Sequence, residues 1–539
     1  MSKLKTSLNA LWKMARPLRG SLAVSVAIGL VRIAASLGFV WVCKALVDIA
    51  TGEKAGSLGL FIGLMIGIML VQLAASTAAS YWESYISVNT LNRIRFNTFT
   101  HVLNSTWNGK ESYDSGDIIN RLQEDVRVLT ELLCTRIPDV VVTLCQLVAS
   151  SIFLMALAPN LLWLLLLFMA VAVVGSRMFF KMLQELTRKI RSKDGEIQQY
   201  MQENLLNRVL VLTLEGTERV AEKLGWMQKD VKDNTVRRLN YNAVARGFMI
   251  MGFMAGYAAA FLWGVLGIKD GSVTYGMMTA FLQLVGQVQR PVAELGRNVP
   301  AFIHALVSVE RIVDLQDLEP EEQADPIALP GAPSIEVKDL GFSYPGQREP
   351  VFTHFSYGFA PGSLTAIMGP TGSGKSTLVK LIMGLLHPSE GEITVGGHKS
   401  GVAIRGNFLY VPQGNSLLSG TIRDNLLLAN ASATEEEMWK ALSLAKADFV
   451  KDLPQGLDER CGEAGSGLSE GQSQRVAIAR ALLHPGGVLI LDEATSALDA
   501  DTERELLANL YSAYHSSKTI LFISHRDAVA GYSDAILRL

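Results

Sequence analysis

Residues 369–377 read Gly-Pro-Thr-Gly-Ser-Gly-Lys-Ser-Thr, and this stretch decides the fold of the C-terminal part of the chain. It matches the phosphate-binding pattern G-x-x-x-x-G-K-[ST] and lies between a strand-like apolar run (363–368) and a helix-like run (377–386). Glycines in such a loop let backbone N–H groups wrap around phosphate oxygens, and the following helix N-terminus adds a favourable field. The pattern therefore predicts an α/β nucleotide-binding domain. We expect nucleotide contacts from Gly369, Gly372, Gly374, Lys375, Ser376 and Thr377.

Two residues of the same loop have predicted chemical roles, and the ends of two further apolar runs provide more candidate catalytic residues. We predict that Lys375 reaches the β- and γ-phosphate oxygens and that the Ser376 hydroxyl ligates Mg²⁺. Residues 487–491 form a strand-like run that ends at Asp492 and Glu493, where a Mg²⁺ ligand and a base for the attacking water are typical. A third run, 519–524, ends at His525, which can contact the γ-phosphate or the water. Strand ends meet at one sheet edge, so these residues should share one site.

The first part of the chain has a composition that suits a lipid environment. The chain of 539 residues is 49% hydrophobic and only 19% charged, with a mean hydropathy of +0.25, whereas soluble proteins carry about 25% charged residues. A helix needs about 20 apolar residues to span a membrane, and one apolar run alone could be a buried soluble core, but six recur here. The candidate spans are 21–49, 57–80, 137–158, 161–180, 245–268 and 272–288.

Positive charge predicts the orientation of these spans. Lysine and arginine gather before the first span and after the fourth, whereas the short turns near 51–56, 158–160 and 269–271 have few. We therefore expect both termini to be cytoplasmic. The long segments 81–136 and 180–244 contain few Gly or Pro residues, so we expect helices to continue past the membrane, with short transverse helices near Gly116 and Gly216.

Polar side chains interrupt or border several spans and leave two interpretations open. They can line a translocation path, or they can snorkel to head groups and pair between helices. The residues concerned are Arg32, Glu83, Asp139, Gln283, Gln287, Gln289 and Arg290. The net charge of −2 averages two unlike halves and gives no reason to expect nucleic acid, and the four scattered cysteines predict neither a disulfide nor a metal site.

An acidic, proline-rich segment at 317–334 predicts a linker. The expected domains are therefore a transmembrane domain at 1–316, the linker, and a nucleotide-binding domain at 335–539. The predicted fold is an α-helical six-span membrane domain with long cytoplasmic helix extensions, followed by an α/β P-loop ATPase domain with a helical subdomain.

A segment upstream of the Asp492 run identifies a family. Leu468-Ser-Glu-Gly-Gln472 resembles the signature motif LSGGQ of the ABC transporter superfamily, and it leads into the helix-like 473–480. Four more motifs of this family occur along the chain in the family's order: an aromatic residue that stacks on adenine, the Q-loop, the D-loop and the switch histidine. The resemblance assigns these motifs to Tyr344, Gln413, Asp499 (in Ser496-Ala-Leu-Asp499) and His525. It makes Gln413 a third neighbour of Mg²⁺. It also implies that Ser469, Gly471 and Gln472 contact the ATP that is bound to the other subunit.

The membrane half resembles the exporter type of the same family. Ser115-Gly-Asp-Ile-Ile-Asn-Arg-Leu122 is similar to that type's first intracellular loop, Cys461-Gly-Glu-Ala-Gly465 to its X-loop, and 308–312 to its exit from the sixth helix. Three features depart from the family. Glu470 replaces the first signature glycine, the stretch 396–413 is short, and Leu539 follows His525 closely, so that we expect a less stable edge there.

The resemblance implies an ATPase coupled to transmembrane transport. One chain carries one P-loop and one signature, so we expect a dimer of half-transporters that uses ATP and Mg²⁺ to export or flip a small molecule, lipid or peptide by alternating access. We expect an integral protein of the bacterial inner membrane in contact with lipid, and no nucleic acid partner. An ATP-gated channel or sensor is the alternative; separate importer subunits and a cargo-processing peptide exporter fit less well. Cargo identity and the choice between homodimer and heterodimer stay open.

Overall fold

The computed structural model describes residues 11–107, 115–347, 349–462 and 467–539. It divides into two compact units. The helical unit comprises Met1–Phe99 and Ile119–Gln316, and the α/β unit comprises Thr100–Ile118 and Asp317–Leu539. The short segment around residue 100 therefore packs with the C-terminal part, although it lies in the expected transmembrane range.

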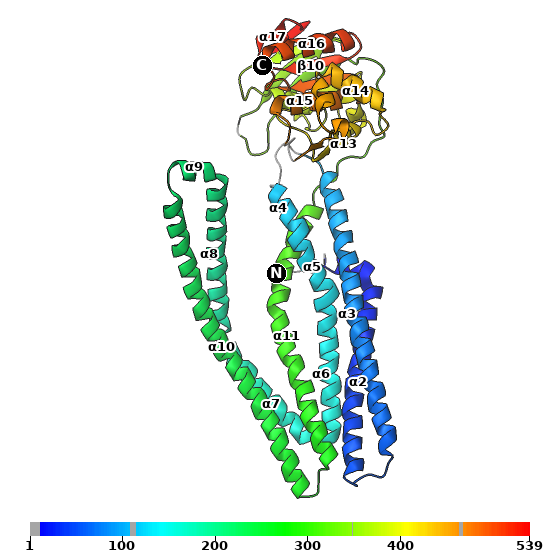
Figure 1. The fold of residues 1–539 in the computed structure, drawn as a ribbon, viewed down its shortest axis with the longest axis vertical. Coiled ribbons are helices and arrows are strands. Elements are labelled where there is room, and N and C mark those ends of the chain that lie inside the picture. Colours follow the sequence, from blue (N-terminus) through cyan, green and yellow to red (C-terminus); the bar gives the residue numbers. More distant parts are fainter. Residues whose placement is uncertain (1–10, 108–114, 348, 463–466) are drawn as a thin grey trace. The chain divides into compact units, whose positions relative to one another are not determined.

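The helical unit is built from long helices that follow the apolar runs (Figure 1). Two stretches of π-helix (Arg121–Asp125 and Leu132–Arg136) join α4, α5 and α6 into one continuous helical segment. The helices are α2 (Arg19–Ala50), α3 (Leu58–Leu103), α4 (Ser115–Asn120), α5 (Val126–Glu131), α6 (Ile137–Leu157), α7 (Pro159–Arg177), α8 (Phe180–Leu206), α9 (Arg208–Thr213), α10 (Thr217–Lys269) and α11 (Tyr275–Gln316), preceded by the 3₁₀ turn Arg16–Leu18.

Four helical stretches in the described part of the chain are long and apolar enough to cross a membrane: Leu11–Ala50, Leu58–Leu103, Gly116–Leu157 and Thr217–Lys269. A shorter apolar helix covers Pro159–Ala172. The helical membrane domain is thus confirmed, while the count of six spans stays a prediction. The helix α11 is continuous, but polar residues interrupt its apolar run and lower its hydropathy. These residues are Gln283, Gln287, Gln289 and Arg290.

The predicted continuation of the helices is confirmed by their lengths. The helices α3 and α10 have 46 and 53 residues, well above the roughly 20 that a membrane requires. The short helix predicted near Gly216 is α9, which lies at the tip of the α8–α10 hairpin, with Gly216 at the N-cap of α10 (Figure 1). Near Gly116 the helix α4 begins instead, and residues 108–114 lie outside the described part.

Buried apolar side chains close the helical unit at the end of its short turns. Residues of α2, α6, α7, α10 and α11 form this cluster, with Leu154, Leu165, Phe281 and Leu284 fully buried. At the same end Asp48 of α2 accepts a hydrogen bond from the Gly276 N–H of α11 (3.0 Å) and pairs with Lys44 (2.9 Å). This end is therefore tightly packed by both apolar and polar contacts.

The α/β unit contains a parallel sheet and an antiparallel sheet. The parallel sheet has the order β11-β3-β10-β9-β6, the antiparallel sheet has the order β2-β1-β4-β5, and β7 pairs with β8. The strands are β1 (Ile335–Phe342), β2 (Phe352–Phe359), β3 (Leu364–Met368), β4 (Glu390–Val395), β5 (His398–Lys399), β6 (Phe408–Val411), β7 (Gly420–Thr421), β8 (Arg460–Cys461), β9 (Val488–Asp492), β10 (Thr519–Ile523) and β11 (Ala535–Arg538).

Helices cover this unit and enclose two cores. The helices are α12 (Lys375–Ile382), α13 (Ile422–Leu427), α14 (Glu435–Leu444), α15 (Glu470–Leu482), α16 (Ala500–Tyr514) and α17 (Asp527–Ala530), with 3₁₀ turns at Val402–Asn407, Asp448–Asp452 and Gly456–Asp458. Every residue of β9 and β10 is buried, as expected for parallel strands covered on both faces. The helical part around α13, α14 and α15 shares one core, and α12 and the antiparallel sheet share the other. The predicted α/β architecture with a helical subdomain is confirmed.

The segment around residue 100 is tied to the linker inside this unit. The Thr106 N–H donates to the Glu319 carbonyl, and the Glu321 N–H donates to the Asn104 carbonyl, each at 2.8 Å. The Lys380 ammonium of α12 lies 5.0 Å from the centre of the Trp107 ring. The chain that leaves α3 is thus anchored on the helix that follows the P-loop.

Candidate ATP site

The P-loop has the backbone conformation that its glycines predict. Gly372 and Gly374 have φ values of 88° and 96°, in the left-handed region that favours glycine. A side chain at Gly374 would lie 2.8 Å from Val351 and 2.9 Å from Phe352. The loop follows β3 and opens α12, so its N–H groups meet the positive end of that helix.

Two polar groups of this loop fit a phosphate ligand. The Lys375 ammonium, in a residue only 6% exposed, donates to the Gly369 and Pro370 carbonyls at 2.8 and 2.9 Å. The Ser373 hydroxyl is buried and has no hydrogen-bond partner among the described residues. Buried polar groups normally have hydrogen-bond partners. The Ser373 hydroxyl is therefore free to donate to a phosphate oxygen, and the Lys375 ammonium beside it can exchange its loop carbonyls for phosphate oxygens. The residues present therefore fit a nucleotide phosphate.

Ser376 and Asp492 lie next to each other at the ends of α12 and β9. The Ser376 hydroxyl donates to Asp492 Oδ1 at 3.3 Å, and the Tyr410 hydroxyl donates to Oδ2 at 3.5 Å. Asp492 is 3% exposed, and burial, with the neighbouring Glu493 carboxylate, raises the pKa of Asp492. Burial and the nearby Asp492 carboxylate also raise the pKa of Tyr410, so Tyr410 is a donor at neutral pH. A cation at this carboxylate would relieve the cost of burying its charge.

Glu493 is held from both sides. Its carboxylate accepts from Gln413 Nε2 at 2.8 Å and lies 3.0 Å from His525 Nε2. Its backbone has a φ of 50°, which is rare for a residue with a side chain and occurs at strained functional positions. The Glu493 N–H donates to the Ile523 carbonyl, which fixes this residue against the end of β10. The sequence-predicted base, switch histidine and Q-loop glutamine are thus brought together.

The expected adenine-stacking residue also reaches the loop. The Tyr344 hydroxyl lies 3.0 Å from the Thr377 hydroxyl, and its ring packs edge-on against Phe342 at 5.0 Å between centroids. Tyr344 therefore stands beside the P-loop helix with its ring position fixed by β1.

The signature residues form a separate cluster at the start of α15. Ser469 caps this helix: its hydroxyl accepts from the Gln472 N–H (3.2 Å), and the Gln472 side chain accepts from the Ser469 N–H (2.9 Å). A side chain at Gly471 would lie 2.8 Å from the Ala497 carbonyl, so only glycine permits this close approach. Glu470 is exposed in the first helical turn, where a carboxylate suits the helix dipole.

Three residues that the sequence did not single out connect the two clusters to the sheet. Gln474 donates to the Ser496 hydroxyl at 3.0 Å and accepts from the Ala497 N–H at 3.1 Å. Arg526, next to His525, donates to the carbonyls of Ser496 and Leu498. The third is Tyr410, described above. Arg526 follows a predicted residue directly, which was the one available signal. Asp499 itself caps α16 and accepts from the Thr502 N–H at 2.9 Å.

The structure does not bring the signature to the P-loop of the same chain. Within residues 349–462 and 467–539, no hydrogen bond or ion pair joins Ser469–Gln472 to residues 369–377. The described residues also contain no cluster of three His, Cys, Asp or Glu side chains that could hold a metal alone. A Mg²⁺ site here would use Ser376, Asp492, Gln413 and substrate oxygens, which is how this ion is usually bound. The predicted X-loop, Cys461–Gly465, lies largely outside the described residues, which omit 463–466.

Two family models match this chain. The model of the ABC transporter transmembrane region matches residues 22–292, and the ABC transporter model matches residues 352–496. The helical unit and the P-loop-to-D-loop region thus match in the same order along the chain.

Individual relatives match over almost the whole length. The ATP-dependent lipid A-core flippase of Vibrio cholerae is 29% identical over 98% of this chain and 92% of its own length. The flippase of the same description from Desulfotalea psychrophila is 30% identical over 80% of this chain and 76% of its own length. A solved bacterial Atm1-family ABC exporter with ATP bound has a TM-score of 0.80 and 25% identity, over 97% of this chain and 93% of that one.

Proposed function

This chain belongs to the ABC transporter family, and from that premise we propose that it is an exporter half-transporter whose two ATP sites form between two chains. The observation that carries this proposal is the separation inside the chain between the P-loop and the signature. Each is locally complete, with Lys375 folded onto its own loop and Ser469 capping α15. A P-loop that needs a signature opposite it must therefore receive one from a second chain.

ATP hydrolysis is assigned to the residues that the structure holds together. Lys375 exchanges its contacts with the Gly369 and Pro370 carbonyls for phosphate oxygens, and Tyr344 offers its ring to the base. Glu493 orients and deprotonates the attacking water, while His525 holds the Glu493 carboxylate in place from one side and Gln413 from the other. Catalysis is then positioning and charge stabilisation rather than covalent chemistry.

The Mg²⁺ ion belongs to the same proposal. Ser376, Asp492 and Gln413 would hold it, and it would neutralise charge that develops on the phosphate oxygens. The buried, raised-pKa carboxylate of Asp492 is the observation that supports a cation at this position.

The second chain is proposed to complete each site through its own Ser469, Gly471, Gln472 and Asp499. The cap fixes Ser469 at the start of α15, where its hydroxyl proton stays available to donate to a ligand. Gln474 ties this helix to the segment around Ala497, and Arg526 ties the end of β10 to the same segment. A structural change at the γ-phosphate can thus be transmitted through these contacts to both the signature residues and His525. Identical chains supply all these residues, so a homodimer is sufficient.

Transport follows from the helical unit. The packed end of the short turns closes one side of the bundle, and a polar cavity lies farther along the helices. We place the short turns outside and both termini in the cytoplasm of a bacterial cell, with the protein in its inner membrane. ATP-driven closure of the two nucleotide-binding domains would then open this outer end, so that a small molecule, lipid or peptide is exported or flipped.

The experiment that tests this proposal is Mg-ATPase activity of the purified chain in lipid nanodiscs. The Glu493→Gln variant should lose activity by about a hundredfold or more, because a positioned base contributes about 10²–10⁴-fold. The matched control is Glu436→Gln, an exposed carboxylate at the start of α14, which should retain full activity. Full activity of Glu493→Gln would contradict the role of Glu493 as the base, and an inactive but ATP-binding wild-type chain would contradict a self-sufficient homodimer.

A further inference from the structure

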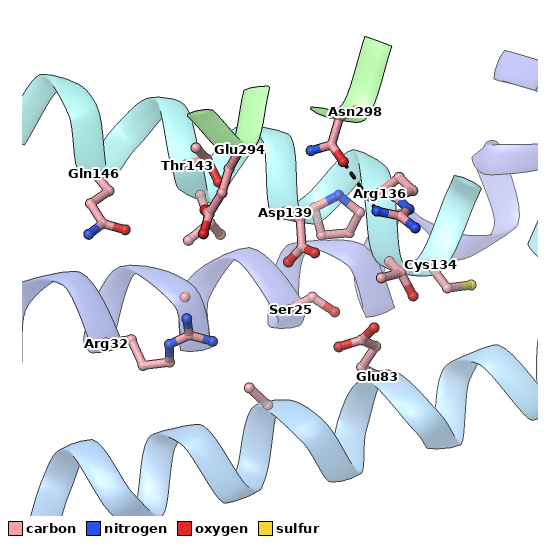
Figure 2. A pocket seen from close by; sticks show the side chains of 15 residues that line it. Ser25, Arg32, Glu83, Cys134, Arg136, Asp139, Thr143, Gln146, Glu294 and Asn298 are labelled. Carbon is pink, nitrogen blue, oxygen red and sulfur yellow. Dashed lines mark hydrogen bonds between the residues drawn. The ribbon is translucent and has the colours of Figure 1, made fainter. Parts of the chain in front are cut away.

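A polar cavity lies inside the helical unit. Its volume is about 530 Å³, and it is lined by α2, α3, α6, the π-helical turn before α6, and α11. Figure 2 shows Arg32 of α2, Glu83 of α3 and Asp139 of α6 pointing into one space, with Ser25 and Gln146 beside them. A space of this size holds a small organic molecule.

Three charged side chains of this cavity lack a hydrogen-bond or ion-pair partner in the part of the chain that the structure describes. Arg32, Glu83 and Asp139 make no side-chain hydrogen bond and no ion pair with another described residue. Two of them, Arg32 and Asp139, are exposed to the cavity, and Glu83 is half-buried. Ionisable groups within membrane helices are costly and normally face a partner or a ligand. Three such groups from three helices, all directed into one cavity, therefore indicate a ligand.

The other charged groups of the wall do have partners. Arg136 pairs with Glu131 at 2.7 Å, and it donates to the Asn298 side chain at 3.2 Å. Glu294 pairs with Arg290 of the preceding turn of α11 at 3.3 Å. The arginine that could balance the cavity carboxylates is thus already neutralised, so the unpaired set, two carboxylates and one guanidinium, is acidic.

Arg32 and Asp139 lie at a similar depth in the helical unit. With a rise of 1.5 Å per residue, Arg32 is about 27 Å from the end of α2 at Ala50, and Asp139 is about 27 Å from the end of α6 at Leu157. Glu83 is farther, about 38 Å from the start of α3. In a hydrocarbon core of about 30 Å, the cavity stands near the boundary opposite the short turns.

The polar residues of α11 behave differently and do not contribute unpaired charge. Gln287 donates to the Ser36 hydroxyl at 2.9 Å, and Gln289 donates to the Phe253 carbonyl at 3.1 Å. For these two residues, pairing between helices explains the polar side chain. For Arg32, Glu83 and Asp139 it does not.

We propose that this cavity binds an organic cation with an apolar body, with Asp139 and Glu83 contacting its positive group. This deepens the proposed function, because it names the class of cargo that the exporter would accept. The wall of the cavity is mainly polar, and Ala79, Pro138 and Val142 supply the apolar contacts for the body of such a ligand. Arg32 limits the site to one cationic group by repelling a second.

The test is equilibrium binding to the nucleotide-free chain in nanodiscs, with empty nanodiscs subtracted. The probes are tetraphenylphosphonium and tetraphenylborate, which share shape and apolar surface but carry opposite charge. Wild-type protein should bind the phosphonium saturably and the borate at least about tenfold more weakly. Equal affinities, or preference for the borate, would overturn the proposal without requiring any variant.

Variants then assign the charge. Asp139→Asn and Glu83→Gln should each weaken phosphonium binding about tenfold, and Arg32→Gln should strengthen it several-fold. Asp139→Glu should retain most of the affinity. Asp270→Asn, an exposed carboxylate at the end of α10, is the control and should change nothing. Unchanged binding in both carboxylate variants would place the cation elsewhere.

Because no nucleotide is present, this experiment is independent of ATP hydrolysis. Cation binding with no Glu493-dependent ATPase would overturn the proposed function and leave the cavity assignment intact. Glu493-dependent ATPase with no preference between the two probes would do the reverse.

Discussion

In the α/β unit the functional charged groups contact one another, whereas in the helical unit three of the charged groups that face the cavity make no hydrogen bond or ion pair with a described residue. Glu493 is fixed by His525 and Gln413, and Asp492 by Ser376. Arg32, Glu83 and Asp139 have no such contacts among the described residues. A site that performs the same reaction in every cycle gains from preorganised groups. A site that must release its ligand after each cycle gains from groups that are satisfied only when the ligand is present.

The largest expected effect is a loss of ATPase activity that leaves ligand binding in the helical unit unchanged. Lys375→Ala removes the ammonium that reaches the phosphates and should lower ATPase activity about a hundredfold or more. Phosphonium binding in the cavity should be unchanged, because Lys375 contacts only its own loop. Lys399→Ala, an exposed lysine on β5, is the control for both measurements. Loss of cation binding in Lys375→Ala would show that the two sites are not independent without nucleotide.

A second prediction tests how tightly the ATPase groups act together. His525→Ala leaves Glu493 held only by Gln413 and should lower turnover about ten- to a hundredfold, with little change in ATP affinity. The matched control is His398→Ala, an exposed histidine on β5. A drop in affinity with unchanged turnover would mean that His525 binds ATP and does not position the base.

The third prediction concerns the cost of preorganisation. Because the folded-state pKa of Asp492 is raised, its contribution to stability is present below the usual carboxyl pKa and is lost as pH rises through the folded value. Asp492→Asn should therefore raise the nucleotide-free melting temperature at pH 7 by about 3 °C, while abolishing hydrolysis. The gain should shrink towards pH 4. Asp501→Asn, with an exposed side chain, should show no such trend. A lower melting temperature at pH 7 would contradict the burial argument.

The smallest effect is expected at the signature. Glu470→Gln removes an exposed carboxylate near the place proposed for the other chain's γ-phosphate, and should lower the KM for ATP about threefold at low salt. Added salt should reduce this difference, since exposed charges are screened. An unchanged KM at low salt would mean that the Glu470 side chain points away from ATP.

The sequence predicted the ATPase groups well because they follow strands. Asp492 ends the buried strand β9, Glu493 follows it directly, and His525 lies two residues after the buried strand β10. Parallel strands bring such residues to one edge of the sheet whatever the loops do. Tyr410 and Arg526 were missed because their roles depend on a hydrogen bond across strands and not on a spacing along the chain. The capping box of Ser469 and Gln472 was readable as S-x-x-Q before a helix.

The cavity could be predicted only in part. Arg32, Glu83 and Asp139 stand out as charges in apolar runs, yet the sequence left snorkelling and pairing open for each of them. Which helices pack side by side is set by side-chain fit between distant segments, so the pairing of Arg136 with Glu131 and the sharing of one cavity by five elements were not predictable. The two π-helical stretches before α6, which shift side chains around its axis, had no sequence signal either.

The central claim is that each ATP site is divided between two chains, and cross-linking tests it most directly. One tagged chain carries Ser373→Cys and a differently tagged chain carries Ser469→Cys, both with Glu493→Gln and with the four native cysteines replaced. The account predicts a covalent pair containing both tags, formed with a short thiol cross-linker only when Mg-ATP is present. A pair that forms equally without ATP, or no mixed pair while ATP is bound, would contradict it.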